Sequence, residues 1–79
     1  MALPIIVAPA GDGWTVRSEE LQTELTFAQG GPAELAARAL ADQVAARGRL
    51  AEVSIFLRDG ALAGRFLHAP TAEGLSLTA

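Results

Sequence analysis

Few side chains in this sequence could carry out chemistry, and they lie far apart along the chain. His68 is the one histidine, and histidine is the side-chain type most often used to shuttle protons at neutral pH. It stands at the end of an expected strand, before Ala69-Pro70, with no nucleophile or carboxylate expected beside it. The chain has no cysteine, which removes thiolate nucleophiles, disulfides and cysteine metal sites. The sequence therefore predicts no enzyme: we expect no catalytic residue and no cofactor.

Two glycine-rich segments could hold an anion through backbone N–H groups. Gly11-Asp12-Gly13 comes before an expected strand, whereas a phosphate-binding loop opens a helix, so we interpret it as a turn. Gly30-Gly31-Pro32 does open an expected helix, either as a flexible helix entry or as an anion site. The second possibility gives an alternative hypothesis, a small-molecule or anion-binding domain that uses Gly30, Gly31, Arg65 and His68.

Charged residues exclude several other classes of function. The carboxylates of Asp12, Glu19, Glu20 and Glu24 could reach a cation, but their spacing matches no calcium loop, so we predict a solvated face and no metal. Six arginines, scattered along the chain, stand against nine acidic residues and leave a net charge of −3. Nucleic-acid binders need a clustered basic face, so we predict no nucleic-acid partner.

The length and the apolar content predict one small domain. The chain has 79 residues, of which 51% are hydrophobic. We expect a single α+β domain over residues 1–68, and a C-terminal tail over 69–79 that is loose or adds a strand. The apolar run at the N-terminus is broken by Pro4 and Pro9, far short of a signal peptide or a membrane span. We therefore predict a cytoplasmic protein with no membrane partner.

Alternating apolar residues predict three strands in the first third of the chain, at about 3–8, 14–18 and 22–28. Pro4 cannot donate to a ladder, which places the first strand at a sheet edge or Pro4 at a strand start. A helix follows from Pro32, at its first position, to Arg47, with Glu34 in the first turn and Gly48 as a left-handed C-cap. The face expected to be buried consists of Leu35, Ala36, Ala39, Leu40, Gln43 and Val44. The opposite face consists of Glu34, Arg38 and Asp42, which can pair in sequence.

The last two strands, at 52–58 and 61–68, form the clearest expected hairpin, because Asp59-Gly60 suits a two-residue type I′ loop. That register turns one set of pairs toward the helix: Leu57–Leu62, Ile55–Gly64 and Val53–Phe66. It turns another set away from the helix: Phe56–Ala63, Ser54–Arg65 and Glu52–Leu67. We predict a β-β-β-α-β-β domain, an antiparallel sheet of four to five strands with one helix on one face. Its expected core is Ile5 or Val7, Trp14, Val16, Leu25 or Phe27, Leu35, Leu40, Val44, Val53, Ile55, Leu57, Leu62 and Phe66.

A single helix leaves the other face of such a sheet open to solvent, and that face is expected to carry apolar residues. Phe56 would gather there with Leu67, Ala63 and Ile6, unless it is isolated or covered by the tail. Trp14 is either a core anchor or an aromatic hot spot of an interface. The leading hypothesis is a non-enzymatic module that forms a homo-oligomer, a dimer foremost, or binds a protein partner, through the outer sheet face or a strand edge.

Short motifs along the chain are similar to those of one known family. They are Gly13-Trp14-x-Val16, Thr26-Phe27 before an Ala-rich helix with Glu34 near its start, Glu52-Val53-x-Ile55 and Arg58-Asp59-Gly60-x-Leu62. Over about residues 5 to 65 the chain resembles the small bacterial family catalogued as domain of unknown function 2188. The resemblance implies a strand-strand-helix-strand layout, and it implies no known activity and no functional residues.

Overall fold

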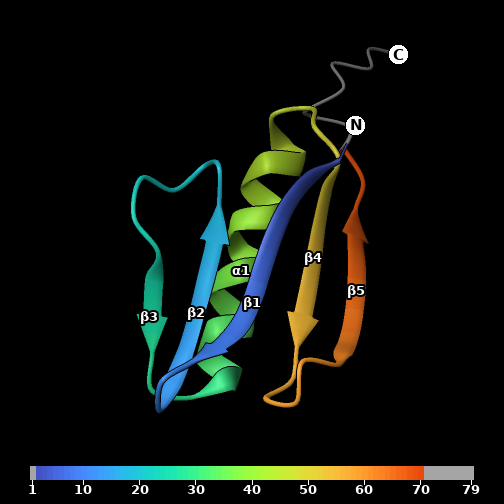
Figure 1. Cartoon of the computed structure of the whole chain (residues 1–79). Helices are drawn as coiled ribbons and strands as arrows, with labels where there is room; N and C mark the ends of the chain where they lie inside the picture. Colours follow the sequence, from blue (N-terminus) through green and yellow to red (C-terminus); the bar gives the residue numbers. More distant parts are fainter. Residues whose placement is uncertain (1, 71–79) are drawn as a thin grey trace, which may run out of the picture.

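The computed structural model describes residues 2–70, which form a five-stranded sheet with one helix across one face (Figure 1). The elements follow the predicted order: β1 (Leu3–Ala10), β2 (Gly13–Ser18), β3 (Leu25–Phe27), α1 (Gly30–Ala46), β4 (Ala51–Phe56) and β5 (Leu62–His68). In space the strands run β3-β2-β1-β4-β5. The predicted α+β fold is confirmed, with the refinement that β1 and β4 pair in parallel while the other neighbours pair antiparallel. The tail expected at 69–79 lies outside the described residues from 71 onward.

β1 is the central strand, so of the two expectations for Pro4 the strand start is correct and the sheet edge is wrong. The N–H of Leu3 donates to the carbonyl of Leu50, on the β4 side, over 2.8 Å. Successive residues of a strand alternate in direction, so the missing N–H of Pro4 would point to the β2 side. The pairing with β2 begins only at Ile5↔Ser18. Pro4 therefore removes no hydrogen bond from the sheet.

The helix begins at Gly30 rather than at Pro32, which corrects two expectations about its N-terminus. Pro32 is the third helical residue, and no acidic residue lies in the first turn, so Glu34 does not lie there. At the C-terminus the helix ends at Ala46, one residue before the expected Arg47, which is the C-cap residue. The expected left-handed Gly48 is confirmed, with φ +91°. The N–H of Gly48 donates to Ala45 over 3.0 Å and that of Arg49 to Val44 over 3.2 Å, the two bonds of a Schellman motif.

The buried face of the helix differs from the predicted one. It consists of Ala33, Ala37, Ala41, Val44 and Ala45, whereas Leu35 is 70% exposed. Large side chains project from the sheet beneath it, among them Leu3, Ile5, Val7, Val16 and Val53, all buried. The helix fits closely over these side chains because its contact stripe is alanine at every fourth position. A pattern of apolar residues favours the face that carries Leu35, and this face is not the one that packs on the sheet.

The predicted core is confirmed at the centre of the sheet and wrong at both of its edge strands, in the β4–β5 hairpin and at Leu35 of the helix. Residues confirmed as buried are Ile5, Val7, Val16, Val44 and Val53, with Trp14, Phe27, Leu40 and Ile55 packed against them. Leu35, Leu57, Leu62 and Phe66 are exposed instead, as is Leu25, which was the alternative to Phe27. Leu3 and the alanines of α1 take their place in the core. The core is therefore formed mainly by three neighbouring strands and the alanine stripe of α1.

The register of the last hairpin is as predicted far from the loop and wrong next to it. Pairs Glu52↔Leu67, Val53↔Phe66, Ser54↔Arg65 and Ile55↔Gly64 are confirmed. A register shift follows between Ile55 and Phe56, so that Phe56 pairs with Leu62 and not with Ala63. The loop has three residues, since Gly60 N–H bonds to Leu57 O over 2.9 Å and Leu57 N–H to Ala61 O over 2.8 Å. Gly60, at φ +87°, takes the left-handed position that such a loop requires.

Candidate protein-binding face of the sheet

α1 is the one helix within residues 2–70, and it lies behind the sheet in Figure 1, so the face toward the viewer carries no second layer of secondary structure. Strand alternation and pairing place Ile6 of β1 at the centre of this outer face, between Arg17 of β2 and Ser54 of β4. Phe56 of β4 lies further toward the loops, beside Leu62 of β5. The outer face therefore combines an apolar centre with charged positions on both sides.

An open depression of about 440 Å³ lies on this face, at the end of the sheet that carries the β1–β2 loop and the β4–β5 loop. Its lining consists of Ile6, Ala8, Pro9, Arg17, Phe56, Leu57, Arg58 and Gly60. Ile6 and Phe56 are each half-buried, so part of their apolar surface remains available to a partner. Apolar side chains ringed by a few polar groups are typical of a surface that another molecule covers.

Arg58 fastens the two hairpin loops together beside this depression. Its Nη1 donates to the carbonyl of Gly11 over 3.0 Å, and its Nη2 lies 3.3 Å from the carbonyl of Asp12 and 3.4 Å from that of Gly13. The guanidinium also lies over the ring of Trp14, 5.5 Å from its centroid. No local sequence pattern signals this role of Arg58, because its contacts join residues 45 to 47 positions apart.

Two ion pairs flank the apolar centre of the outer face. On one side Arg17 Nε lies 3.6 Å from Glu24 Oε2, and on the other Arg65 Nε lies 2.9 Å from Glu52 Oε2. Both arginine side chains are more than half exposed. Such exposed pairs contribute about 1 kcal/mol or less to folding, because water screens them. Their main effect is to give each side of the face both charges.

Three of the five predicted interface residues share the outer face: Ile6, Phe56 and Leu67. Ala63 falls in the register shift, and Leu62 takes the position opposite Phe56 that was predicted for it. Trp14 lies on the helix side, packed against the core, where an added Cβ on Gly30 would lie 3.1 Å from the indole Cε2. Of the two expectations for Trp14, the structure supports the core anchor.

The residues of the alternative anion-site hypothesis lie in three separate places. Gly30 and Gly31 begin α1 at the end of the sheet that carries the hairpin loops (Figure 1). Arg65 is on the outer face, paired with Glu52. His68 pairs with Ala51 at the opposite end of the sheet, with its side chain on the helix side. The structure does not bring these four residues together into one site.

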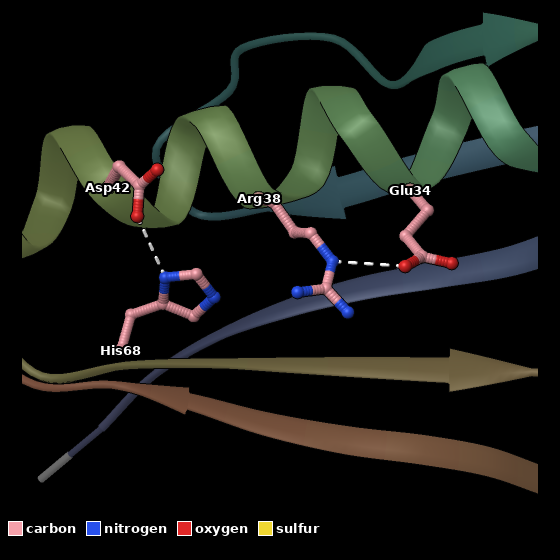
Figure 2. A network of polar contacts seen from close by, with 4 residues as sticks. All are labelled: Glu34, Arg38, Asp42 and His68. Atoms are coloured by element: carbon pink, nitrogen blue, oxygen red, sulfur yellow. Dashed lines mark hydrogen bonds and ion pairs between the residues drawn. The ribbon is translucent and has the colours of Figure 1, made fainter.

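His68 instead belongs to a polar strip between α1 and β5, drawn in Figure 2. Its Nδ1 lies 2.9 Å from Asp42 Oδ1, and because a carboxylate only accepts, Nδ1 carries the hydrogen. One turn back along the helix, Arg38 Nε donates to Glu34 Oε2 over 3.0 Å, and its guanidinium covers the ring of Phe66 at 4.2 Å from the centroid. These helix residues were expected on the face opposite the buried one, pairing in sequence, and the Glu34–Arg38 pair confirms that in part. Arg38 and Asp42 also contact β5, which they fasten to the flank of the helix.

A hydrogen-bonded His–Asp pair can orient an imidazole for catalysis, but it needs a nucleophile or a metal beside it. Ser54, on the strand next to β5, faces the opposite side of the sheet from His68. Within residues 2–70 no group of three or more metal-binding side chains gathers. The position of the His68–Asp42 pair is accounted for by its structural role, joining the end of β5 to α1.

Comparison with protein-family models, curated proteins and solved structures found no match to this chain. The resemblance to domain of unknown function 2188 stays a prediction. In the part of the chain that the structure describes, α1 lacks the length and apolar character needed to cross a lipid bilayer.

Proposed function

We propose that this protein is a non-enzymatic module that binds a second copy of itself through the outer face of the sheet. The observation that carries the proposal is that the face opposite α1 presents Ile6, Phe56, Leu62 and Leu67 with no second layer over them among the described elements. Covering such side chains is favourable by about 25 cal/mol per Å² of apolar surface removed from water. A second layer supplied by another chain gives them that cover.

The size of the face determines how strong this association is. Five strands about 4.8 Å apart span about 19 Å, and the eight residues of β1 extend over about 26 Å, which gives about 500 Å² per copy. The total of about 1,000 Å² is at the lower end of specific interfaces, where reversible complexes are found. We therefore expect a dimer with a dissociation constant of about micromolar or weaker, seen only when concentration is varied widely.

The test is the solution mass by sedimentation equilibrium from about 1 μM to about 1 mM, a range that brackets such affinities. Phe56→Ser should lower the mass at every intermediate concentration without unfolding the chain. A matched pair of variants removes one exposed leucine from each side of the molecule: Leu67→Gln on the outer face, where Leu67 is 65% exposed, and Leu35→Gln on the helix, where Leu35 is 70% exposed. Leu67→Gln should weaken the dimer and Leu35→Gln should not.

Two results would overturn the proposal. One is a wild-type chain that stays monomeric across the whole range. The other is a dimer that Leu35→Gln weakens as much as Leu67→Gln and Phe56→Ser do, because the contact would then not depend on the outer face. Far-ultraviolet circular dichroism of each variant confirms that the fold is intact before the masses are compared.

A further inference from the structure

The charges on the outer face follow a regular order across the sheet. Glu24 lies beside Arg17, at the β3 side, since the two form an ion pair and Glu24 directly precedes β3. Arg17 is on β2, Glu52 on β4 and Arg65 on β5. With the strands in the order β3-β2-β1-β4-β5, the signs across the face are negative, positive, negative, positive, with Ile6 of β1 in the middle.

This order makes the face complementary to itself in one orientation. A half-turn about an axis parallel to β1, lying between two stacked faces, reverses the order across the sheet. The partner copy then presents positive, negative, positive, negative, and each of these four charges lies across from one of opposite sign. A half-turn about an axis perpendicular to the strands leaves the order unchanged and sets each charge against its own kind, which costs several kcal/mol in an interface.

We infer that the dimer has its two-fold axis parallel to β1, with Arg17 of each copy opposite Glu52 of the other and Glu24 of each opposite Arg65 of the other. This inference rests on the self-association proposed above. The two arginines can make these contacts without giving up their present partners, because a guanidinium has five N–H donors and one carboxylate occupies at most two in a fork. Their side chains are 55% and 56% exposed, so the remaining donors face solvent or a second chain.

The arrangement places the apolar centres in contact at the same time. Ile6 lies on the central strand, which faces the axis directly, so it meets its own copy. Phe56 of β4 lies over the β2 side of the other copy, around Thr15, which is buried and small. Apolar and small uncharged residues thus occupy the middle of the interface, and the charges lie on either side of it, as in interfaces with an apolar core and a polar rim.

The experiment reverses two charges that the inference places opposite each other. In a dimer of Arg65→Glu, each introduced glutamate meets Glu24 of the other copy; in a dimer of Glu24→Arg, each introduced arginine meets Arg65. Either variant alone should therefore dimerise at least about tenfold more weakly than the wild type, because like charges meet twice in each dimer.

An equimolar mixture of the two variants should restore the dimer. The glutamate introduced into one chain then meets the arginine introduced into the other, and the unchanged Glu24 of the first chain meets the unchanged Arg65 of the second. Opposite charges meet at both contacts, as they do in the wild type. The mixed dimer should therefore form with a dissociation constant within about threefold of the wild-type value.

Comparing each single variant with the mixture cancels any effect that a substitution has within its own chain. Arg65→Glu puts a carboxylate beside Glu52, and Glu24→Arg puts a guanidinium beside Arg17, but each change is the same in the homodimer and in the mixed dimer. Arg49→Glu serves as a matched control, since Arg49 is 55% exposed, is paired with Glu20 and lies between α1 and β4, off the outer face. It changes the net charge as Arg65→Glu does and should leave the dimer unaffected.

The outcomes separate this inference from the proposal beneath it. The inferred axis is supported if each charge variant dimerises weakly by itself and the equimolar mixture dimerises about as well as the wild type. Suppose instead that Phe56→Ser disrupts the wild-type dimer, but the charge variants keep the wild-type affinity or do not recover it in the mixture. That result overturns the inferred axis and leaves the outer-face proposal standing. A monomeric wild type overturns both.

Discussion

Replacing Gly13 with alanine tests how closely β3 packs against β2. A Cβ built on Gly13 would clash with the carbonyl oxygen of Phe27, which belongs to the backbone of β3. That oxygen cannot move aside as a flexible side chain could. The two strands would have to separate by about 1 Å to restore ordinary contact. We therefore expect Gly13→Ala to loosen the pairing of Trp14 with Phe27.

The size of the effect follows from two opposing contributions. Overpacking at a closely packed position costs about 1–3 kcal/mol. Against this, alanine restricts the unfolded chain more than glycine does, which is worth about 0.5–1 kcal/mol. The net loss of stability is about 1–2 kcal/mol, and in a domain of this size each kcal/mol lowers the Tm by about 4–8 °C. We expect the Tm to fall by about 5–15 °C.

Gly31→Ala is the matched control, because a Cβ at Gly31 would meet no atom within 4 Å and Gly31 lies in the first turn of α1. Its Tm should stay level or rise, since alanine is the better helix former. Thermal unfolding of both variants, followed by circular dichroism at one protein concentration, gives the comparison. Our account of the β2–β3 contact would be refuted if Gly13→Ala melted at or above the wild-type temperature.

Two further substitutions test the packing of the loops and of the helix. Arg58→Ala should lower the free energy of unfolding by about 1–2 kcal/mol in urea titrations. The reason is that it removes the hydrogen bonds from the β4–β5 loop to the carbonyls of the β1–β2 loop. An unchanged urea midpoint would mean that these hydrogen bonds contribute nothing to stability. Ala37→Leu should destabilise the fold by about 1–3 kcal/mol, since Ala37 is fully buried where α1 lies against the sheet. If Ala37→Leu were as stable as the wild type, the helix face described here would be incorrect.

The order of the elements could be predicted because its signals are local. Gly48 marks the end of the helix, and the left-handed conformation it adopts depends only on its own lack of a side chain. The alternating residues of β1, β2 and β4 fix which side chains share a face, whatever the rest of the chain does. From these two kinds of signal follow the fold class and the existence of an outer face.

The rotation of the helix could not be predicted in the same way, because it depends on the surface that the helix covers. Leu35 is more apolar than Ala37, and a pattern of apolarity alone places Leu35 inside. The sheet already supplies the bulk of the core through Ile5, Val7 and Val53, so the best fit is the side of the helix with the smallest residues. Long-range pairs such as His68 with Asp42 depend on this rotation and were missed with it.

The proposed interface depends on one feature that the sequence suggested in part. Asp59-Gly60 correctly indicated a tight hairpin, but the loop closes around three residues, with Gly60 in the left-handed position. The hairpin therefore contains a register shift, and because side chains alternate along a strand, the shift moves Leu62 to the outer face. A two-residue loop would have turned Leu62 toward the helix and set only Ala63 beside Phe56. The three-residue loop replaces a methyl group with a leucine side chain on the face that we propose as the dimer contact, so the conformation of Gly60 influences how much apolar surface is available for association.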